Sequence, residues 1–505
     1  MLRKIASVSG WTLVSRVTGF VRDACMAAIM GAGPVADAFV VAMRLPNHFR
    51  AIFAEGAFNA AFVPKYAKLL GEKNQKGADS FASHIFSLVL AVQAIILVCA
   101  LLGMSWIVYA LTFGFPADPS RFELAVSLSR ITFPYLFFVT LVTVLSGILN
   151  AHGRFAAAAA APVLLNLSLV VFLFLAAFFP TAGHAAAWGF FSAGILELAL
   201  LWYAVKRSGL APEWKKPVLD KDMKEFFRAL GPAVIGSAGV QIAMFADTLI
   251  ASLLPTGAVS SIYYADRLYQ LPVGVIAIAA GTVLLPEMSR KFASGDITGA
   301  YHAQNRAVGL TFVLTIPFFI AFLTMPELIL SALFQRGAFD STAALASAKV
   351  LFAYSVGLPA VMLLRSAVAS FYARQDTTTP VLASLTAVGI NVVLKLVLVK
   401  PLGAPGLALA TALGAWINLI ILVMVGMKRD LMKPDRKLFQ TILISLAASV
   451  PLLIFACWSP DLILAFFSDW RGKNIISLGV CGITGGIMYL SCTLMLFRLL
   501  DGKSS

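Results

Sequence analysis

Charged residues are scarce in this sequence: they make up 12% of its 505 residues, whereas 60% are hydrophobic. So little charge cannot solvate a soluble globule of this size, and the apolar fraction exceeds what globular domains usually contain. The composition excludes a soluble protein and predicts an all-α polytopic membrane protein.

Cysteine and histidine are also rare, with five residues of each. Neither set has paired or metal-ligand spacing, and no Ser/His/Asp or paired-carboxylate arrangement stands out. There is no GxxxxGK[ST] phosphate-binding loop and no insertion large enough for a nucleotide-binding domain. We therefore expect no disulfides, no metal site, no cofactor, no ATP hydrolysis and no enzyme activity.

The formal net charge is +15, which in a soluble protein would suggest a nucleic-acid partner. Here the basic residues fall mostly in short segments between apolar runs, which suits contact with an anionic bilayer surface, so nucleic acid is not expected. The start of the chain resembles a signal peptide, but Arg16, Arg22 and Asp23 interrupt its apolar run. We interpret it as a retained first helix.

Charge-poor runs of about 20 residues, bounded by Gly, Pro and charge clusters, predict fourteen membrane spans. They lie near residues 5–29, 34–66, 81–112, 124–150, 160–180, 183–205, 222–251, 258–288, 305–335, 344–373, 379–399, 405–427, 438–458 and 475–498. Pro46 and Pro272 are expected to kink two long helices.

The distribution of Lys and Arg provides an independent check on this count. With a cytoplasmic N-terminus, the predicted inside segments and their flanks hold 23 basic residues, and the outside segments hold five. The five are Arg121, Arg336, Lys400, Arg471 and Lys473. A missed or invented span would scramble this asymmetry, so fourteen spans with both termini in the cytoplasm is the prediction.

Internal repetition predicts two lobes. The motifs Ala-Asp, Leu-Pro, Gly and a second apolar-Pro pair in the second span recur in the same order in the eighth. This offset of six spans predicts an N-lobe at 1–206, a basic cytoplasmic linker at 207–224, a C-lobe at 225–428 and a terminal helix pair at 429–505. Transporters commonly bind substrate between such halves.

Five arginines interrupt the predicted spans: Arg16, Arg22, Arg44, Arg50 and Arg267. A guanidinium stays charged, and each one at a helix centre costs about 2.5–3.5 kcal/mol. Such residues usually face a bundle interior or a wet cavity, and the planar fork of arginine suits bidentate binding of phosphate oxygens.

The alternative is that each arginine forms a structural ion pair or extends its head group to the membrane interface. The pairs to consider are Arg22–Asp23, Arg44–Asp37 and Arg267–Asp266. The nearby carboxylates, Asp23, Asp37, Glu55 and Asp266, are fewer than the cations, which favours an anionic ligand for the set.

Other charged residues within the spans carry less weight. Arg365 faces either a cavity or a structural partner, and Lys349 and Lys395 are expected to extend to a membrane interface. Glu197 and Asp247 are candidates for binding a coupling cation, with a structural hydrogen-bonding role as the alternative.

Two blocks of sequence carry a family resemblance. The first is Ser15-Arg16-Val17-Thr18-Gly19-Phe20-Val21-Arg22-Asp23, followed by Ala36-Asp37-Ala38-Phe39 and Phe53-Ala54-Glu55-Gly56. The second is Tyr263-Tyr264-Ala265-Asp266-Arg267-Leu268, followed by Leu271-Pro272. With the count of fourteen spans, the chain resembles the MurJ (MviN) family of lipid II flippases over its whole length.

The resemblance implies the fold of the multidrug/oligosaccharidyl-lipid/polysaccharide exporter superfamily, and it implies a bacterial inner-membrane location. It also implies a central cationic cavity and a hydrophobic groove, built with the last two helices, for a polyprenyl tail. The substrate-binding residues that it implies are Arg16, Arg22, Arg50 and Arg267. The gate or supporting residues are Ser15, Asp37, Arg44, Glu55 and Gln270.

Two positions depart from the family pattern. Arg44 is not one of the family's usual arginines, so we assign it as the partner of Asp37. An acidic gate residue of some relatives corresponds to Gln270, which leaves an Arg267–Gln270 hydrogen bond in place of an ion pair.

The expected mechanism is alternating access. The arginines capture the diphosphate of lipid II from the cytoplasmic side, and rocking of the lobes exposes the head group to the periplasm. A diphosphate offers about two negative charges, so four cations repel one another until substrate neutralises them. Membrane potential or a monovalent cation then resets the cavity. The sequence does not decide whether the protein also binds proteins of the cell-wall synthesis machinery.

Three alternative functions remain. A flippase for O-antigen or capsule units would share the lobes and the cations. A cation-coupled small-molecule exporter would need acidic cavity walls. A scaffolding membrane protein would tolerate charge reversal at Arg16 and Arg50.

Overall fold

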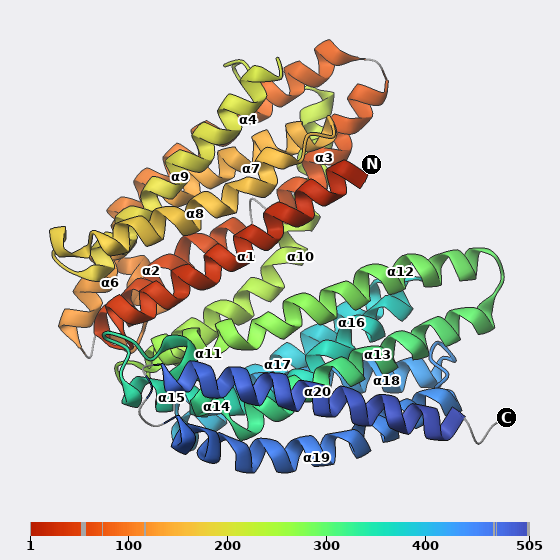
Figure 1. Ribbon diagram of the computed structural model, residues 1–505. Coiled ribbons are helices and arrows are strands. Elements are labelled where there is room, and N and C mark those ends of the chain that lie inside the picture. The colour runs from red at the N-terminus through yellow and green to blue at the C-terminus, as the bar shows by residue number, and fades with distance from the viewer. Residues whose placement is uncertain are drawn as a thin grey trace. The chain divides into compact units, whose positions relative to one another are not determined.

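The computed structural model describes residues 2–51, 57–72, 74–115, 118–467, 470 and 472–501. Every regular element in these ranges is helical (Figure 1). The α-helices are α1 (Leu2–Met30), α2 (Pro34–Arg50), α3 (Ala57–Gly71), α4 (Gln75–Leu102), α5 (Met104–Leu111), α6 (Pro119–Thr132), α7 (Tyr135–Ala151), α8 (Ala156–Phe174), α9 (Ala182–Arg207), α10 (Lys221–Ser252), α11 (Ala258–Pro272), α12 (Ile278–Ala293), α13 (Ile297–Thr324), α14 (Pro326–Phe334), α15 (Ser341–Ser355), α16 (Leu358–Tyr372), α17 (Thr378–Leu402), α18 (Ala404–Lys428), α19 (Arg436–Phe466) and α20 (Lys473–Asp501). Two short helical segments are η3 (Ala176–Phe178) and η4 (Val273–Ala277), the latter a π-helix.

Several predicted spans are two helices joined by a break. Pro134 lacks a backbone N–H and separates α6 from α7. Gly357 precedes α16, where the chain bends by 40° after α15. A Cβ at Gly357 would lie 2.6 Å from the Cα of Ala412, so this close approach to α18 requires glycine. At Pro272 α11 gives way to η4, whereas α2 continues through Pro46 to Arg50, so the kinks expected at these two prolines stay predictions.

Within the described residues, nine helical stretches are long and apolar enough to cross a membrane, and the bent pair α15–α16 makes a tenth. The four predicted spans outside this set correspond to α1, α2 with α3, α10, and α11 with α12. Three of these four carry the membrane arginines of the sequence. The multi-span helical class is therefore confirmed, and the count of fourteen stays a prediction.

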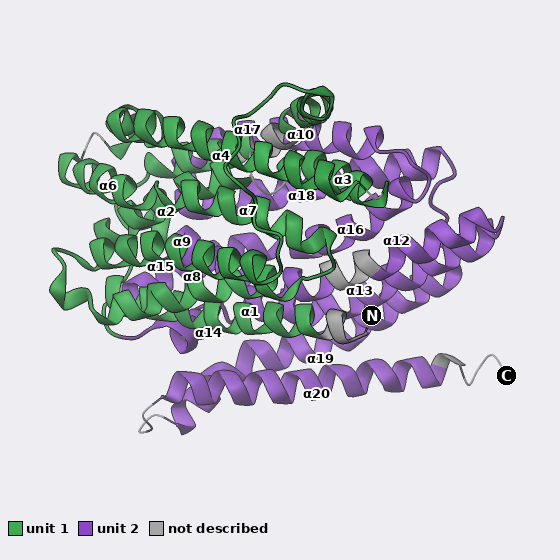
Figure 2. Ribbon diagram, turned by 90° about the horizontal axis from the view of Figure 1, so that it is seen from above, with its two compact units in different colours: residues 1–260, 337–339 green, residues 261–336, 340–505 purple. Residues whose placement is uncertain are grey.

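The chain divides into two compact units (Figure 2). Unit 1 comprises residues 1–260 and 337–339, and unit 2 comprises residues 261–336 and 340–505. In unit 1, α8 packs against α1 and α9, α2 against α6, and α10 against α3. In unit 2, α17 and α15 pack against α18, and α19 against α13 and α20. The predicted lobe limits, which rest on internal repetition, stay a prediction.

The predicted basic linker lies along α4. The backbone N–H of Glu213 donates to the Ser83 hydroxyl at 3.0 Å, and the N–H of Lys215 donates to the Ser87 hydroxyl at 3.1 Å. Because these polar side chains satisfy backbone donors of a non-helical segment, the linker is held on unit 1.

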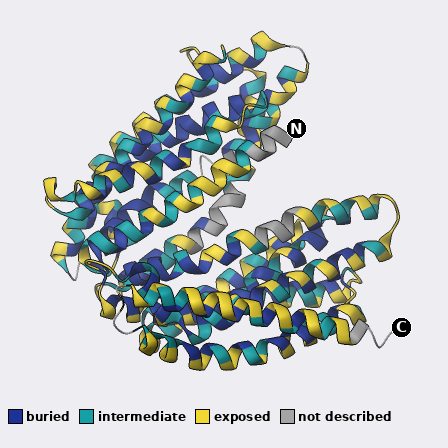
Figure 3. Ribbon diagram, viewed as in Figure 1, coloured by how far each residue is buried: buried dark blue, intermediate teal, exposed yellow. Residues whose placement is uncertain are grey.

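Aromatic packing forms a core in unit 1, and outward helix faces are apolar. Phe62 stacks on Phe58 at 5.2 Å and on Tyr66 at 5.4 Å between ring centroids. Exposed residues lie along the outer helices in both units (Figure 3), and only 22% of the apolar window of α20 is buried. Apolar side chains this exposed along whole helices indicate contact with lipid.

Candidate functional site

Arg22 lies on α1 in unit 1, where Asp23 and Asn166 both bind its guanidinium. Its Nε and Nη2 donate to Asp23 Oδ1 at 3.0 and 2.7 Å, and its Nη1 donates to Asn166 Oδ1 on α8 at 2.9 Å. The Arg22–Asp23 ion pair, which the sequence offered as the structural alternative for this arginine, is thus present. The Arg22 side chain is therefore held between α1 and α8, with 11% of its surface exposed.

Asn166 also ties α8 to α1. Its Nδ2 donates to the backbone carbonyl of Ser15 at 3.0 Å and to the hydroxyl of Thr18 at 3.1 Å. Gly19 lies against the amide, since a Cβ there would be 3.4 Å from Nδ2. Ser15, predicted as a supporting residue, contributes its main-chain carbonyl to this network. Nothing in the local sequence around Asn166 predicted its role.

The other predicted site arginines lie in both units. In unit 1, Arg16 is exposed on α1, and Arg50 is half-buried at the end of α2. In unit 2, Arg267 is half-buried on α11, and its guanidinium carbon lies 4.6 Å from the centroid of the Tyr263 ring. That cation–π contact positions a charge without neutralising it.

Asp37, on α2, is fully buried and lies against the first turn of α11. Residues 258–260 of that turn belong to unit 1. Asp37 Oδ1 accepts hydrogen bonds from the Ser260 N–H at 2.8 Å and the Ser260 hydroxyl at 2.7 Å, and its Oδ2 accepts from the Gly257 N–H at 2.8 Å. Gly257 has a φ of +90°, which favours glycine. A carboxylate here satisfies the unpaired N–H groups of the first turn.

Arg121, and not Arg44, is the ion-pair partner of Asp37, so the pairing assigned from the sequence is wrong. Arg121 Nη1 lies 3.6 Å from Asp37 Oδ2, and both side chains are almost completely buried. Residues seven apart on a helix share a face but are separated by about 10 Å along the axis. Arg44 therefore lies beyond ion-pair distance, whereas α6 packs directly against α2.

The sequence places Arg121 in an outside segment between two predicted spans; in the structure it lies buried in the first turn of α6. Its Nη1 donates to the Thr256 hydroxyl at 3.2 Å, and its Nη2 donates to the Ser252 carbonyl at 3.0 Å. The guanidinium carbon also lies 3.8 Å from the centroid of the Phe115 ring. One sequence signal marked it: Arg121 is among the few basic residues on the predicted outside.

Gln270, the predicted gate position, is exposed on α11. Its amide Nε2 donates to Asp266 Oδ1 at 3.4 Å, one turn earlier on the same helix. The expected Arg267–Gln270 hydrogen bond is therefore replaced by a Gln270–Asp266 contact. Glu55, the remaining predicted supporting residue, lies outside the described residues.

The weaker charged candidates separate by burial. Glu197 is 3% exposed and accepts a hydrogen bond from the Tyr135 hydroxyl at 3.3 Å. Asp247 is half-buried on α10. Lys349 and Arg365 are exposed, but Lys395 is only 3% exposed, so its predicted extension to an interface is wrong. Within the described ranges, no three His, Cys, Asp or Glu side chains come close enough to hold a metal ion.

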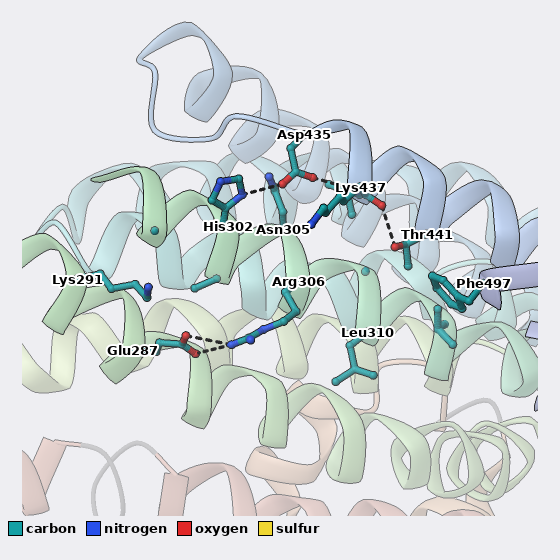
Figure 4. Close-up of a pocket in the computed structure, with 15 residues that line it drawn as sticks. Glu287, Lys291, His302, Asn305, Arg306, Leu310, Asp435, Lys437, Thr441 and Phe497 are labelled. Atoms are coloured by element: carbon teal, nitrogen blue, oxygen red, sulfur yellow. Dashed lines mark hydrogen bonds and ion pairs between the residues drawn. The ribbon is translucent and has the colours of Figure 1, made fainter. Parts of the chain in front are cut away.

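A cavity of about 570 Å³ in unit 2 lies among α12, α13, α19 and α20 (Figure 4). One end carries charged side chains, with Arg306 Nη2 3.1 Å from Glu287 Oε1 and His302 Nδ1 3.0 Å from Asp435 Oδ2. Burial raises the pKa of Asp435, but hydrogen bonds from Leu438 and His302 outweigh it and lower the pKa overall. The inner end is lined by apolar side chains, including Leu310, Val313 and Phe497. The cavity is therefore amphipathic.

Comparisons with known proteins agree with this architecture. The model of the family described as "Lipid II flippase MurJ" matches residues 26–477. A Rhizobium meliloti (strain 1021) protein named probable lipid II flippase MurJ is 38% identical over 501 residues, which cover 97% of this chain and 92% of the relative. A Burkholderia cenocepacia lipid II flippase MurJ is 33% identical over 485 residues, which cover 94% and 92%.

Solved structures share the fold. A lipid II flippase MurJ in an inward closed conformation is similar with a TM-score of 0.82 at 24% identity, over 98% of this chain and 99% of that chain. An inward-facing MATE-family transporter of the MOP superfamily is similar with a TM-score of 0.69 at 18% identity, over 82% and 94%. At these identities the likeness concerns the fold alone.

Proposed function

Because the chain belongs to the MurJ family of lipid II flippases, we propose that it moves lipid II from the cytoplasmic to the periplasmic leaflet of the inner membrane. Lipid II is an undecaprenyl-diphosphate glycolipid and a precursor of peptidoglycan. The transport cycle is alternating access, so the protein carries its substrate without making or breaking covalent bonds.

The observation that carries this proposal is the fixation of Arg22 within α1. Arg22 lies within the 29-residue helix α1, where a cation is expensive in lipid unless a ligand or partner compensates it, and Asp23 is one such partner. Asp23 and Asn166 hold the guanidinium in place, which orients its planar fork for phosphate oxygens. Arg16, Arg50 and Arg267 supply the further positive charge that a diphosphate requires.

In the proposed architecture, fourteen spans form two six-helix lobes and a terminal pair, with both termini in the cytoplasm. The ten apolar spans support this count when the four charged or interrupted segments are added to them. The excess of basic residues on one predicted side supports the orientation.

The proposed gate differs from one built on a carboxylate at position 270. Gln270 offers an amide, and the acidic group beside it is Asp266, which accepts its hydrogen bond. Within unit 1, Asp37 accepts hydrogen bonds from the first turn of α11, and Arg121 forms an ion pair with Asp37. Arg44 acts independently of Asp37.

The polyprenyl tail is proposed to lie along α19 and α20. These helices border the amphipathic cavity of Figure 4, whose apolar end suits a hydrocarbon chain. Four cations exceed the charge of one diphosphate, so substrate lowers their mutual repulsion and favours closure of the lobes. Membrane potential or a monovalent cation resets the cycle, with Glu197 and Asp247 as the candidate acidic groups.

The test is the accessibility of lipid II at the outer leaflet after conditional depletion of the protein. Depletion should trap lipid II inside, stop peptidoglycan synthesis and lyse cells, and the wild-type gene should restore all three. A flippase for O-antigen or capsule units would leave peptidoglycan synthesis intact.

Variants of the site sharpen this test. Arg16→Ala, Arg50→Ala and Arg267→Ala should each abolish complementation at normal membrane abundance, because each removes one cation of the diphosphate site. Growth at the wild-type rate with two of these variants would overturn the cationic site. Full activity after charge reversal at Arg16 would indicate a scaffolding role.

A further inference from the structure

We infer that Asn166 is a positioning residue for the transported diphosphate: its amide fixes the guanidinium of Arg22 and fastens α1, which bears that arginine, to α8. This inference rests on the proposed function, since it assigns a role to a residue outside the predicted site. The observation behind it is one buried side chain that bonds both the cation and the backbone carrying it.

The side-chain amide of Asn166 both accepts and donates hydrogen bonds. It is 4% exposed, its Oδ1 accepts from Arg22 Nη1 at 2.9 Å, and its Nδ2 donates to the Ser15 carbonyl and the Thr18 hydroxyl. An oxygen and an NH₂ group on one planar unit are both required. Among side chains of this length, only asparagine supplies an acceptor and two donors without adding charge.

The hydrogen bonds to Arg22 come from two directions. Asp23 engages Nε and Nη2 from the same helix, whereas Asn166 engages Nη1 from α8. The contact with Asp23 restrains one edge of the guanidinium. A second contact from another helix restrains the plane, and a restrained plane loses less entropy when it binds two phosphate oxygens.

The contact at Ser15 has a separate effect. Thr18 donates its own hydroxyl to the Val14 and Ser15 carbonyls, so a carbonyl in this turn of α1 is shared between Thr18 and Asn166. Gly19 allows the amide to approach the helix backbone. The turn that precedes Arg22 is thereby held at a set distance from α8, which fixes where the guanidinium lies as well as how it is oriented.

A double-mutant cycle tests this assignment. Fluorescently labelled lipid II is titrated against the full chain in nanodiscs, using wild type, Asn166→Leu, Arg22→Gln and the double variant. Asn166→Leu should weaken binding about tenfold, because one hydrogen bond to a charged group is lost. The double variant should bind no more weakly than Arg22→Gln alone, because Asn166 acts through Arg22.

A matched control lies in unit 2. Asn391 on α17 is also buried, and its Nδ2 donates to the Ala410 carbonyl at 2.7 Å without contacting an arginine of the site. Asn391→Leu should leave the affinity for lipid II within twofold of wild type. Asn166→Asp retains an acceptor for Arg22. It should nevertheless weaken binding, because it adds a negative charge beside the phosphate and removes the donor to Ser15.

Each outcome decides the matter. Wild-type affinity in Asn166→Leu, or a double variant whose loss is the sum of the single losses, would overturn the positioning role. Equal losses in Asn166→Leu and Asn391→Leu would overturn it too, since they would reflect general destabilisation. If wild type and Arg22→Gln bind lipid II equally, the diphosphate site itself fails, and that result is distinct from a failure of Asn166 alone.

Discussion

Removing Arg121 should destabilise unit 1 strongly, because it leaves Asp37 as a buried carboxylate without a counter-ion. Both side chains are almost completely buried, with 4% and 0% of their surfaces exposed. Breaking a buried pair by deleting one partner costs about 3–5 kcal/mol. Arg121→Leu also removes the hydrogen bonds to Ser252 and Thr256, which places the expected loss in the upper part of that range.

The assay is equilibrium unfolding of the purified protein in mixed micelles with increasing SDS, followed by intrinsic fluorescence. Asp37→Asn should be destabilising too, because it presents an amide NH₂ to backbone donors that now meet a carboxylate oxygen. In Asp37→Asn/Arg121→Leu no buried charge is left alone. The double variant should therefore lose less than the sum of the two single losses.

The matched control in unit 1 is Lys68→Gln. Lys68 lies 3.9 Å from Glu72, and both side chains are mostly exposed, so removing this pair should change stability by less than about 1 kcal/mol. If Arg121→Leu unfolds at the same SDS fraction as Lys68→Gln, or if the losses at positions 37 and 121 are additive, the buried ion pair does not stabilise the fold as argued.

Two further predictions concern unit 2. Gly357→Ala should lower the midpoint of thermal unfolding by several degrees, because the added Cβ would clash with Ala412. Gly389→Ala is the control, since the added Cβ meets open space and should leave the midpoint unchanged. Equal midpoints in the two variants would contradict the close approach of Gly357 to α18. Hydrogen bonds from the Thr379 backbone and hydroxyl hold the pKa of Asp376 below its ordinary value. A depressed pKa stabilises the fold above the unfolded-state value, about 3.9, and this contribution disappears as pH falls through the folded-state value. Unfolding measured from pH 7 to pH 3 should show a smaller acid-induced loss in Asp376→Asn than in wild type, and identical profiles would exclude this contribution.

Local features of the fold could be predicted from the sequence. Apolar runs and the scarcity of charge depend only on consecutive residues, and so do the break at Pro272 and the pair formed by Arg22 and its neighbour Asp23. Helices in lipid satisfy their backbone groups internally, so a run of apolar residues is sufficient to specify a span. Charged residues interrupt the apolar runs of α1 and α10, so these two helices are not among those apolar enough to be recognised as spans by composition.

The partners that buried polar groups find on other helices could not be predicted. The pattern placed Asp37 with Arg44 because they share a helix face, but a shared face brings side chains together only three or four residues apart. Lys395 was expected at an interface because it lies near a helix end, yet helix packing buries it.

By itself, then, the sequence determined the membrane class, the positions of most helices, the family and the identity of the membrane arginines, because each of these is written in consecutive residues or in short motifs. The tertiary structure alone decided which residues of other helices the buried charges contact. It placed Arg121 on Asp37 and Asn166 on Arg22, because the packing of α6 on α2 and of α8 on α1 brings together residues that no spacing along the chain connects.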